Sequence, residues 1–143
     1  MEILITCNSS HPRREFVLQS CSGVLSDLLG SQFDEPATVD TKFVVLIDDD
    51  PKIPNWMRVH GMRETLWKHG FGVDVAGGDV SVVATLASGL QDIVIEMFRT
   101  TVPRCPGHPH PLAVVARDTA EWQCPQDARH FRCPVGAYPQ QTG

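Results

Sequence analysis

The sequence predicts an α+β fold: an antiparallel sheet of three to four strands with two helices on one face, followed by a small zinc-ribbon-like hairpin. Two stretches carry apolar residues at the three- and four-residue spacing of amphipathic helices. Several short stretches alternate apolar with polar residues, as half-buried strands do. Because these strands follow one another through short turns, we expect antiparallel pairing with both helices on one face.

Composition limits the class of protein. A chain of 143 residues fits one domain, or a domain with a small added module. The net charge of −5 argues against a dedicated nucleic-acid-binding protein, which usually carries a basic face. No uninterrupted apolar stretch approaches the roughly 18–20 residues that span a bilayer, and no secretory signal pattern opens the chain. We therefore expect a soluble cytoplasmic protein without a membrane partner, with its thiols reduced.

The first two expected elements are a short strand over Met1–Thr6 and an amphipathic helix. Ser10 or His11 can cap this helix, and Gly30 suits the position after its end. Its apolar stripe is formed by Phe16, Val17, Cys21, Val24, Leu25, Leu28 and Leu29.

Three further strands are expected. The stretch TKFVVLIDDD is β-branched and aromatic, which predicts a strand buried on both faces in its middle. NWMRVHGM alternates like a half-buried strand, and Phe71–Val75 does the same, whereas RETLWKHG between them fits a strand or a helical turn. The carboxylates of Asp48–Asp50 are interpreted as a solvated turn and not as a magnesium site, because no second acidic cluster accompanies them.

The clearest helical stripe begins at Asp79, a natural N-cap, and runs to about Arg99. Pro103 then stops the helix, and the Cys/His-rich segment begins. We therefore divide the chain into an α+β domain over residues 1–103 and a zinc-ribbon-like module over residues 104–143.

The module holds three of the five cysteines and three of the six histidines. Zinc takes four soft ligands tetrahedrally, commonly as two short ligand pairs joined by a longer loop. Cys105 and His108 form one such pair on a Cys-Pro-Gly-His turn, and fifteen residues separate His108 from Cys124. The leading ligand set for a structural Zn²⁺ is Cys105, His108, Cys124 and His130.

Alternatives to this set remain. Cys133 is the rival fourth ligand, and His110 is the rival second ligand. The intervening residues are long enough for a hairpin that pairs Leu112–Val115 with Ala120–Cys124. A metal-free hairpin with buried cysteines and a redox or disulfide role for the thiols are the competing interpretations of the same segment.

The segment CPGHPHPL, followed by W-x-CP and by P-x-G in Pro134–Gly136, resembles the tails of small actinobacterial proteins without an established activity. The resemblance covers roughly Leu86 to Gly136, and the histidine–proline string is its most specific part. It implies a bacterial origin and no chemistry. It favours His130 over Cys133, because the second cysteine lies outside the shared pattern.

Three functions fit the pattern. The first is a non-enzymatic protein whose zinc is structural and whose partner is a protein. The second is a hydrolase-like zinc enzyme with Glu121, Asp127 or Glu96 as base, although no HExxH or related catalytic motif places them and no catalytic residue is predicted. The third is a nucleic-acid-binding zinc ribbon, which four arginines against three acidic residues in the tail do not favour.

Overall fold

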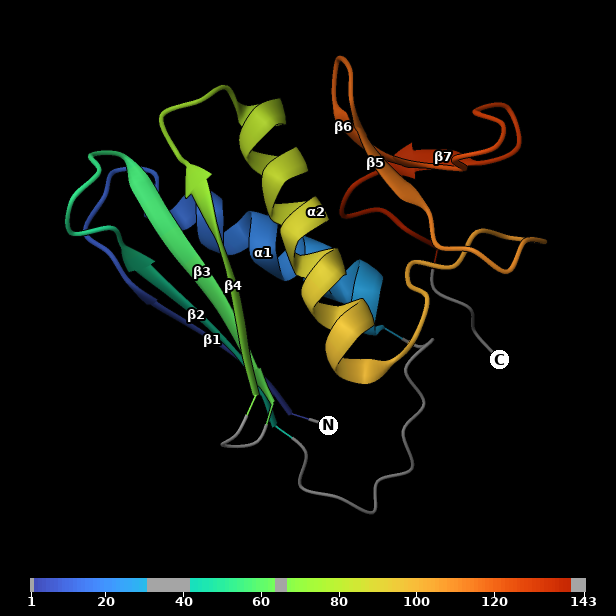
Figure 1. Cartoon of the computed structure of the whole chain (residues 1–143). Helices are drawn as coiled ribbons and strands as arrows, with labels where there is room; N and C mark the ends of the chain where they lie inside the picture. Colours follow the sequence, from blue (N-terminus) through green and yellow to red (C-terminus); the bar gives the residue numbers. More distant parts are fainter. Residues whose placement is uncertain (1, 31–41, 64–66, 140–143) are drawn as a thin grey trace.

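The computed structural model describes residues 2–30, 42–63 and 67–139, and it confirms the α+β class with three layers (Figure 1). The first layer is a four-stranded sheet in sequence order: β1 (Glu2–Asn8), β2 (Lys42–Asp49), β3 (Trp56–Arg63) and β4 (Trp67–Asp74). The helices α1 (Arg14–Leu29) and α2 (Asp79–Phe98) cover one face of this sheet. A small antiparallel sheet of β5 (Ala113–Ala116), β6 (Ala120–Gln123) and β7 (Arg132–Pro134) packs on the other side of the helices.

One strand pair departs from the predicted antiparallel sheet. Strand β1 runs parallel to β2, in the register Ile5 with Val45, whereas β2, β3 and β4 pair antiparallel. The reason is the connection: α1 lies between β1 and β2 in the chain, and such a helical crossover joins parallel strands. The four-stranded sheet is therefore mixed.

The two faces of the four-stranded sheet differ, which corrects the expectation that β2 is buried on both. Phe43, Val45 and Ile47 are fully buried, whereas Val44 and Leu46 between them are only half-buried. The alternation of β3 is confirmed, with Met57 and Val59 in the core. The undecided stretch over residues 63–70 is strand wherever the structure describes it, and residues 64–66 lie outside the description.

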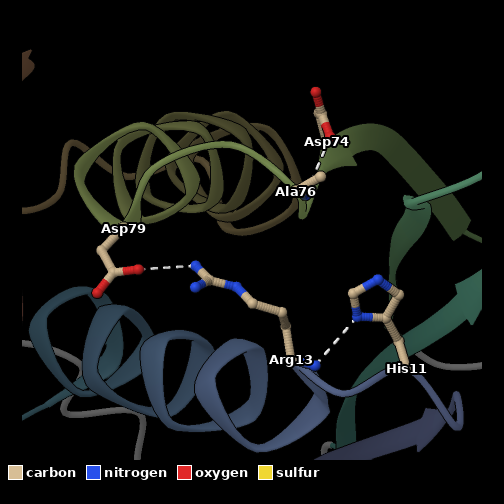
Figure 2. Close-up of polar contacts among 5 residues, drawn as sticks. All are labelled: His11, Arg13, Asp74, Ala76 and Asp79. Atoms are coloured by element: carbon tan, nitrogen blue, oxygen red, sulfur yellow. Dashed lines mark hydrogen bonds and ion pairs between the residues drawn. The ribbon is translucent and has the colours of Figure 1, made fainter.

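The two helices begin side by side, and neither is capped as predicted. The N-cap of α1 is Arg13 and not Ser10 or His11, and the N-cap of α2 is Gly78, which makes Asp79 the first helical residue. Figure 2 shows the polar contacts there: the Arg13 backbone N–H donates to His11 Nδ1 at 3.0 Å, and the Arg13 guanidinium pairs with Asp79 at 2.9 Å. This ion pair joins the start of α1 to the start of α2.

A single hydrophobic core connects all three layers. Its members come from the sheet, from both helices and from the C-terminal segment, where Leu112, Trp122 and Tyr138 are buried. By length and mean hydropathy α2 could cross a membrane, but it lies between two sheets with Leu86, Leu90 and Val94 fully buried. Such burial is expected for the core helix of a soluble protein.

Candidate metal centre

Four side chains of the C-terminal segment come together: Cys105, His108, His110 and Cys124. Their ligand atoms all lie within 4.8 Å of one another. Three of them stand on the loop before β5, and the fourth follows β6 directly. This group could hold a metal ion.

Hydrogen bonds hold together the two ends of the loop that carries Cys105, His108 and His110. The Leu112 N–H donates to the Pro103 carbonyl at 2.8 Å, and the Gln91 side-chain amide of α2 donates to the carbonyls of Val102 at 3.1 Å and Leu112 at 2.6 Å. Gln91 is itself buried, so these bonds are shielded from water. The ends of the loop are therefore fixed to α2 by protein contacts alone.

Inside the loop, the Cys-Pro-Gly-His sequence forms the predicted turn. The His108 N–H donates to the Cys105 carbonyl at 3.1 Å, and the Cys105 N–H donates to the His110 carbonyl at 3.2 Å. Gly107 has a φ of 79°, a left-handed conformation that glycine adopts without steric cost. These bonds direct the side chains of the turn toward one point.

The hairpin brings in the fourth residue. Residues Ala113 and Gln123 pair at the open end of β5 and β6, so Cys124 emerges beside the loop that precedes β5. The Cys124 N–H donates to the Phe131 carbonyl at 2.9 Å, which fixes the backbone there. His108 Nδ1 consequently lies 3.4 Å from Cys105 Sγ and 3.5 Å from Cys124 Sγ.

His110 presents a nitrogen without a partner. Its Nδ1 lies 3.1 Å from the Pro111 carbonyl oxygen, which can only accept, so the proton is on Nδ1 and Nε2 is a bare acceptor. Nε2 is buried and has no hydrogen-bond partner in the described structure. An unpartnered buried acceptor is costly, and a metal ion would satisfy it.

The pKa values of the ligand group are shifted in different directions. Burial raises the pKa of the Cys105 thiol to about 11. Burial also acts to raise the pKa of Cys124, but backbone N–H groups of Asp127 and Gln126 lower the pKa overall. Burial and the neighbouring His130 and His110 lower the pKa of His108, which favours the neutral form of the ring that a metal ligand needs. Without a metal, the Cys105 thiol can donate to a Cys124 thiolate, whereas a divalent cation would stabilise both thiolates.

The structure brings three residues of the leading ligand set together, namely Cys105, His108 and Cys124, and adds the rival His110. His130 lies beside this group, with its ring stacked on that of His108 at 4.2 Å between centroids. Cys133 stands on β7 opposite Trp122, where burial and the charges of Asp27 and Glu121 raise its thiol pKa to about 11.

The choice of the fourth metal ligand stays a prediction. The signal for His110 was its place between Pro109 and Pro111, which turn the chain on both sides of the ring.

The three carboxylates that could act as a general base in a zinc enzyme do not belong to the metal-ligand group. Glu96 on α2 pairs with His69 of β4 at 3.1 Å. Asp127 accepts the Arg129 N–H at 2.9 Å, and Glu121 lies on β6. The metal-ligand group found among the described residues contains none of them.

Sequence reasoning missed the residue that anchors the C-terminal segment to α1. The buried carboxylate of Asp27 accepts three hydrogen bonds: from Trp122 Nε1 at 2.7 Å, from the Gly136 N–H at 2.5 Å and from the Tyr138 N–H at 3.1 Å. The signal was an acidic residue between Leu25 and Leu28 in an apolar helical stripe. A carboxylate at such a position requires partners from elsewhere in the chain.

No protein-family model matches the chain, and no curated protein matches it. The geometry of the metal-ligand group and of the surfaces around it is therefore what indicates a function. The resemblance of the tail to actinobacterial proteins stays a prediction.

Proposed function

We propose that this protein is a non-enzymatic protein-interaction module in which one structural Zn²⁺ is bound by Cys105, His108, His110 and Cys124. The observation that carries the metal site is the buried, unpartnered Nε2 of His110 beside two cysteines and a second imidazole. Two thiolates and two imidazoles form a tetrahedral donor set that suits zinc better than magnesium or calcium, which prefer oxygen ligands.

A structural role follows from the number and burial of the ligands. Four protein ligands fill the tetrahedral shell, which leaves no position for a reacting water. Cys105 is fully buried and Cys124 is 1% exposed, so the sulfur side of the site is closed to solvent. The zinc would join the loop before β5 to the segment after β6, and would thereby fix both ends of the hairpin.

The outer face of the four-stranded sheet supports the interaction role. Leu4, Val44 and Met62 lie side by side on β1, β2 and β3. Leu4 is 40% exposed, and both helices lie on the opposite face (Figure 1). Val44 and Met62 are half-buried, and a row of partly exposed apolar side chains across a sheet is typical of a surface that contacts another protein. The partner that we infer is a protein with an apolar patch of its own.

The purified protein should contain about one zinc per chain, because the ligand group supplies one complete tetrahedral shell. Cys124→Ser should abolish metal binding, whereas Cys133→Ser, the matched thiol on β7, should keep it. Elemental analysis of protein never exposed to chelator or acid measures this. Protein without metal, or loss of zinc in Cys133→Ser alone, would contradict the proposed ligand set.

A photo-crosslinking residue at position 62 should give one discrete covalent adduct with a protein partner in the cells that make this protein. The same residue at position 117, in the exposed turn between β5 and β6, is the matched control. Immunoblotting measures the adducts. Equal adducts from both positions, or none from position 62, would argue against the outer face as the contact surface.

A further inference from the structure

We propose that His130 is a positioning residue of the metal centre, which holds the ring of His108 in place by stacking and does not itself bind the metal. This inference rests on the proposed function, in which His108 is one of four zinc ligands. It assigns a role to the exposed histidine that the sequence analysis includes in the leading ligand set.

The ring that needs holding is that of His108. Its Nδ1 lies 3.4 Å from Cys105 Sγ and 3.5 Å from Cys124 Sγ. It is therefore the ligand atom that is close to both sulfurs. Metal-binding histidines usually donate their other ring N–H to a protein acceptor, which fixes the orientation of the ring. The contacts of this ring with the two sulfurs are both made by Nδ1. A contact with the face of the ring would further limit its rotation, because the terminal torsion of histidine is broad.

Ring stacking provides this contact. The rings of His108 and His130 lie 4.2 Å apart between centroids with an angle of 28° between their planes. The ring of His110 is farther from His108, at 4.9 Å, and more steeply inclined, at 42°. Rotation of His108 away from the sulfurs would break the stacked contact with His130.

His130 is itself held at two points. Its Nε2 contacts the Pro106 carbonyl oxygen, so Nε2 carries the proton and is occupied as a donor. Its backbone N–H donates to the Asp127 carbonyl at 3.0 Å. The ring also passes near Gly107, where a Cβ would lie 3.8 Å from His130 Cε1. His130 therefore joins the Cys105–His108 turn to the segment after Cys124.

The test is titration of the apoprotein with Co²⁺, which reports affinity and ligand set together through its absorption spectrum. His130→Ala should bind Co²⁺ about 10- to 100-fold more weakly than wild type, the usual effect of removing a residue that orients a ligand. Its visible bands and thiolate charge-transfer bands should keep the wild-type pattern of two sulfurs and two nitrogens. His110→Ala is the contrast, because loss of a ligand should change the band pattern itself.

His130→Phe separates stacking from hydrogen bonding and guards against a general folding defect. Phenylalanine keeps a flat ring over His108 but cannot donate to Pro106, so its Co²⁺ affinity should lie close to wild type. Unchanged affinity in His130→Ala, an altered band pattern in that variant, or equal weakening by Phe and Ala would each overturn the proposal. A wild-type protein that binds no Co²⁺ would instead refute the metal site, and this inference with it.

Discussion

Replacement of Asp27 by Ala should lower the free energy of unfolding by about 3–5 kcal/mol, because three donors would lose the carboxylate that accepts from them and each unsatisfied buried group costs about 1–3 kcal/mol. The donors are Trp122 Nε1 and the backbone N–H groups of Gly136 and Tyr138. All three belong to the segment that packs over α1, so its packing should loosen first. Urea unfolding followed by tryptophan fluorescence and by circular dichroism measures the change.

Two controls define the origin of the effect. Asp27→Asn should cost less than Asp27→Ala, because an amide oxygen can still accept from Trp122 and Gly136 while its NH₂ group faces the Tyr138 N–H. Asp92→Ala removes an exposed carboxylate from α2 and should change stability by no more than about 0.5 kcal/mol. Wild-type stability in Asp27→Ala would show that the three bonds contribute nothing.

The pH dependence of Asp27 has an unusual sign for a carboxylate. Burial raises its pKa, and the hydrogen bonds from Trp122, Gly136 and Tyr138 offset this only in part. The folded state therefore holds the proton to higher pH than the unfolded state. The contribution of this group is complete below the unfolded pKa and is lost as the pH rises through the raised folded pKa. Wild type should accordingly lose stability relative to Asp27→Asn over that interval.

Periodicity predicts the elements whose buried face is continuous along the chain. The stripe from Val82 to Met97 marks α2, and the alternation of Met57 and Val59 marks β3, as the structure confirms. The hairpin of β5 and β6 is also confirmed. Strand β7 escaped prediction because Arg132–Pro134 is too short to show alternation and depends on pairing with β6. The local sequence pattern cannot reveal a strand that forms only because it pairs with a neighbouring strand.

Contacts between distant residues explain the other differences. The parallel pairing of β1 with β2 depends on the path of the chain through α1. No residue of β1 itself indicates that path. Asp27 and Trp122 are 95 residues apart in the sequence, so only the folded structure shows that the two side chains form a hydrogen bond. His110 and His130 are both plausible ligands by spacing. The hydrogen bonds of their rings, to Pro111 and Pro106, distinguish them only in three dimensions.

Removal of the proposed zinc by a chelator should lower the melting temperature by about 10–20 °C while most of the helical signal at 25 °C persists. A ligand at a thousandfold excess over its Kd stabilises a protein by about 4 kcal/mol, and each kcal/mol shifts the melting temperature of a domain of this size by roughly 3–5 °C. Differential scanning calorimetry and far-UV circular dichroism with and without chelator measure the two quantities. A variant with Cys105 and Cys124 both replaced by Ser is the control, and the chelator should not affect it.

The melting temperature and the helical signal should respond differently because different contacts stabilise the metal-binding segments and the helices. The ligand loop and the segment from Cys124 to His130 have few buried residues apart from the cysteines, so we expect them to loosen and to become sites of proteolysis. Trp122 and Leu112 stay packed against the helices, and Gln91 and Asp27 keep their bonds to the segments on either side. The two helices and the described strands of the four-stranded sheet should therefore stay folded. Cooperative loss of all helix on chelation would contradict this prediction, because it would show that the helices depend on the metal for their stability.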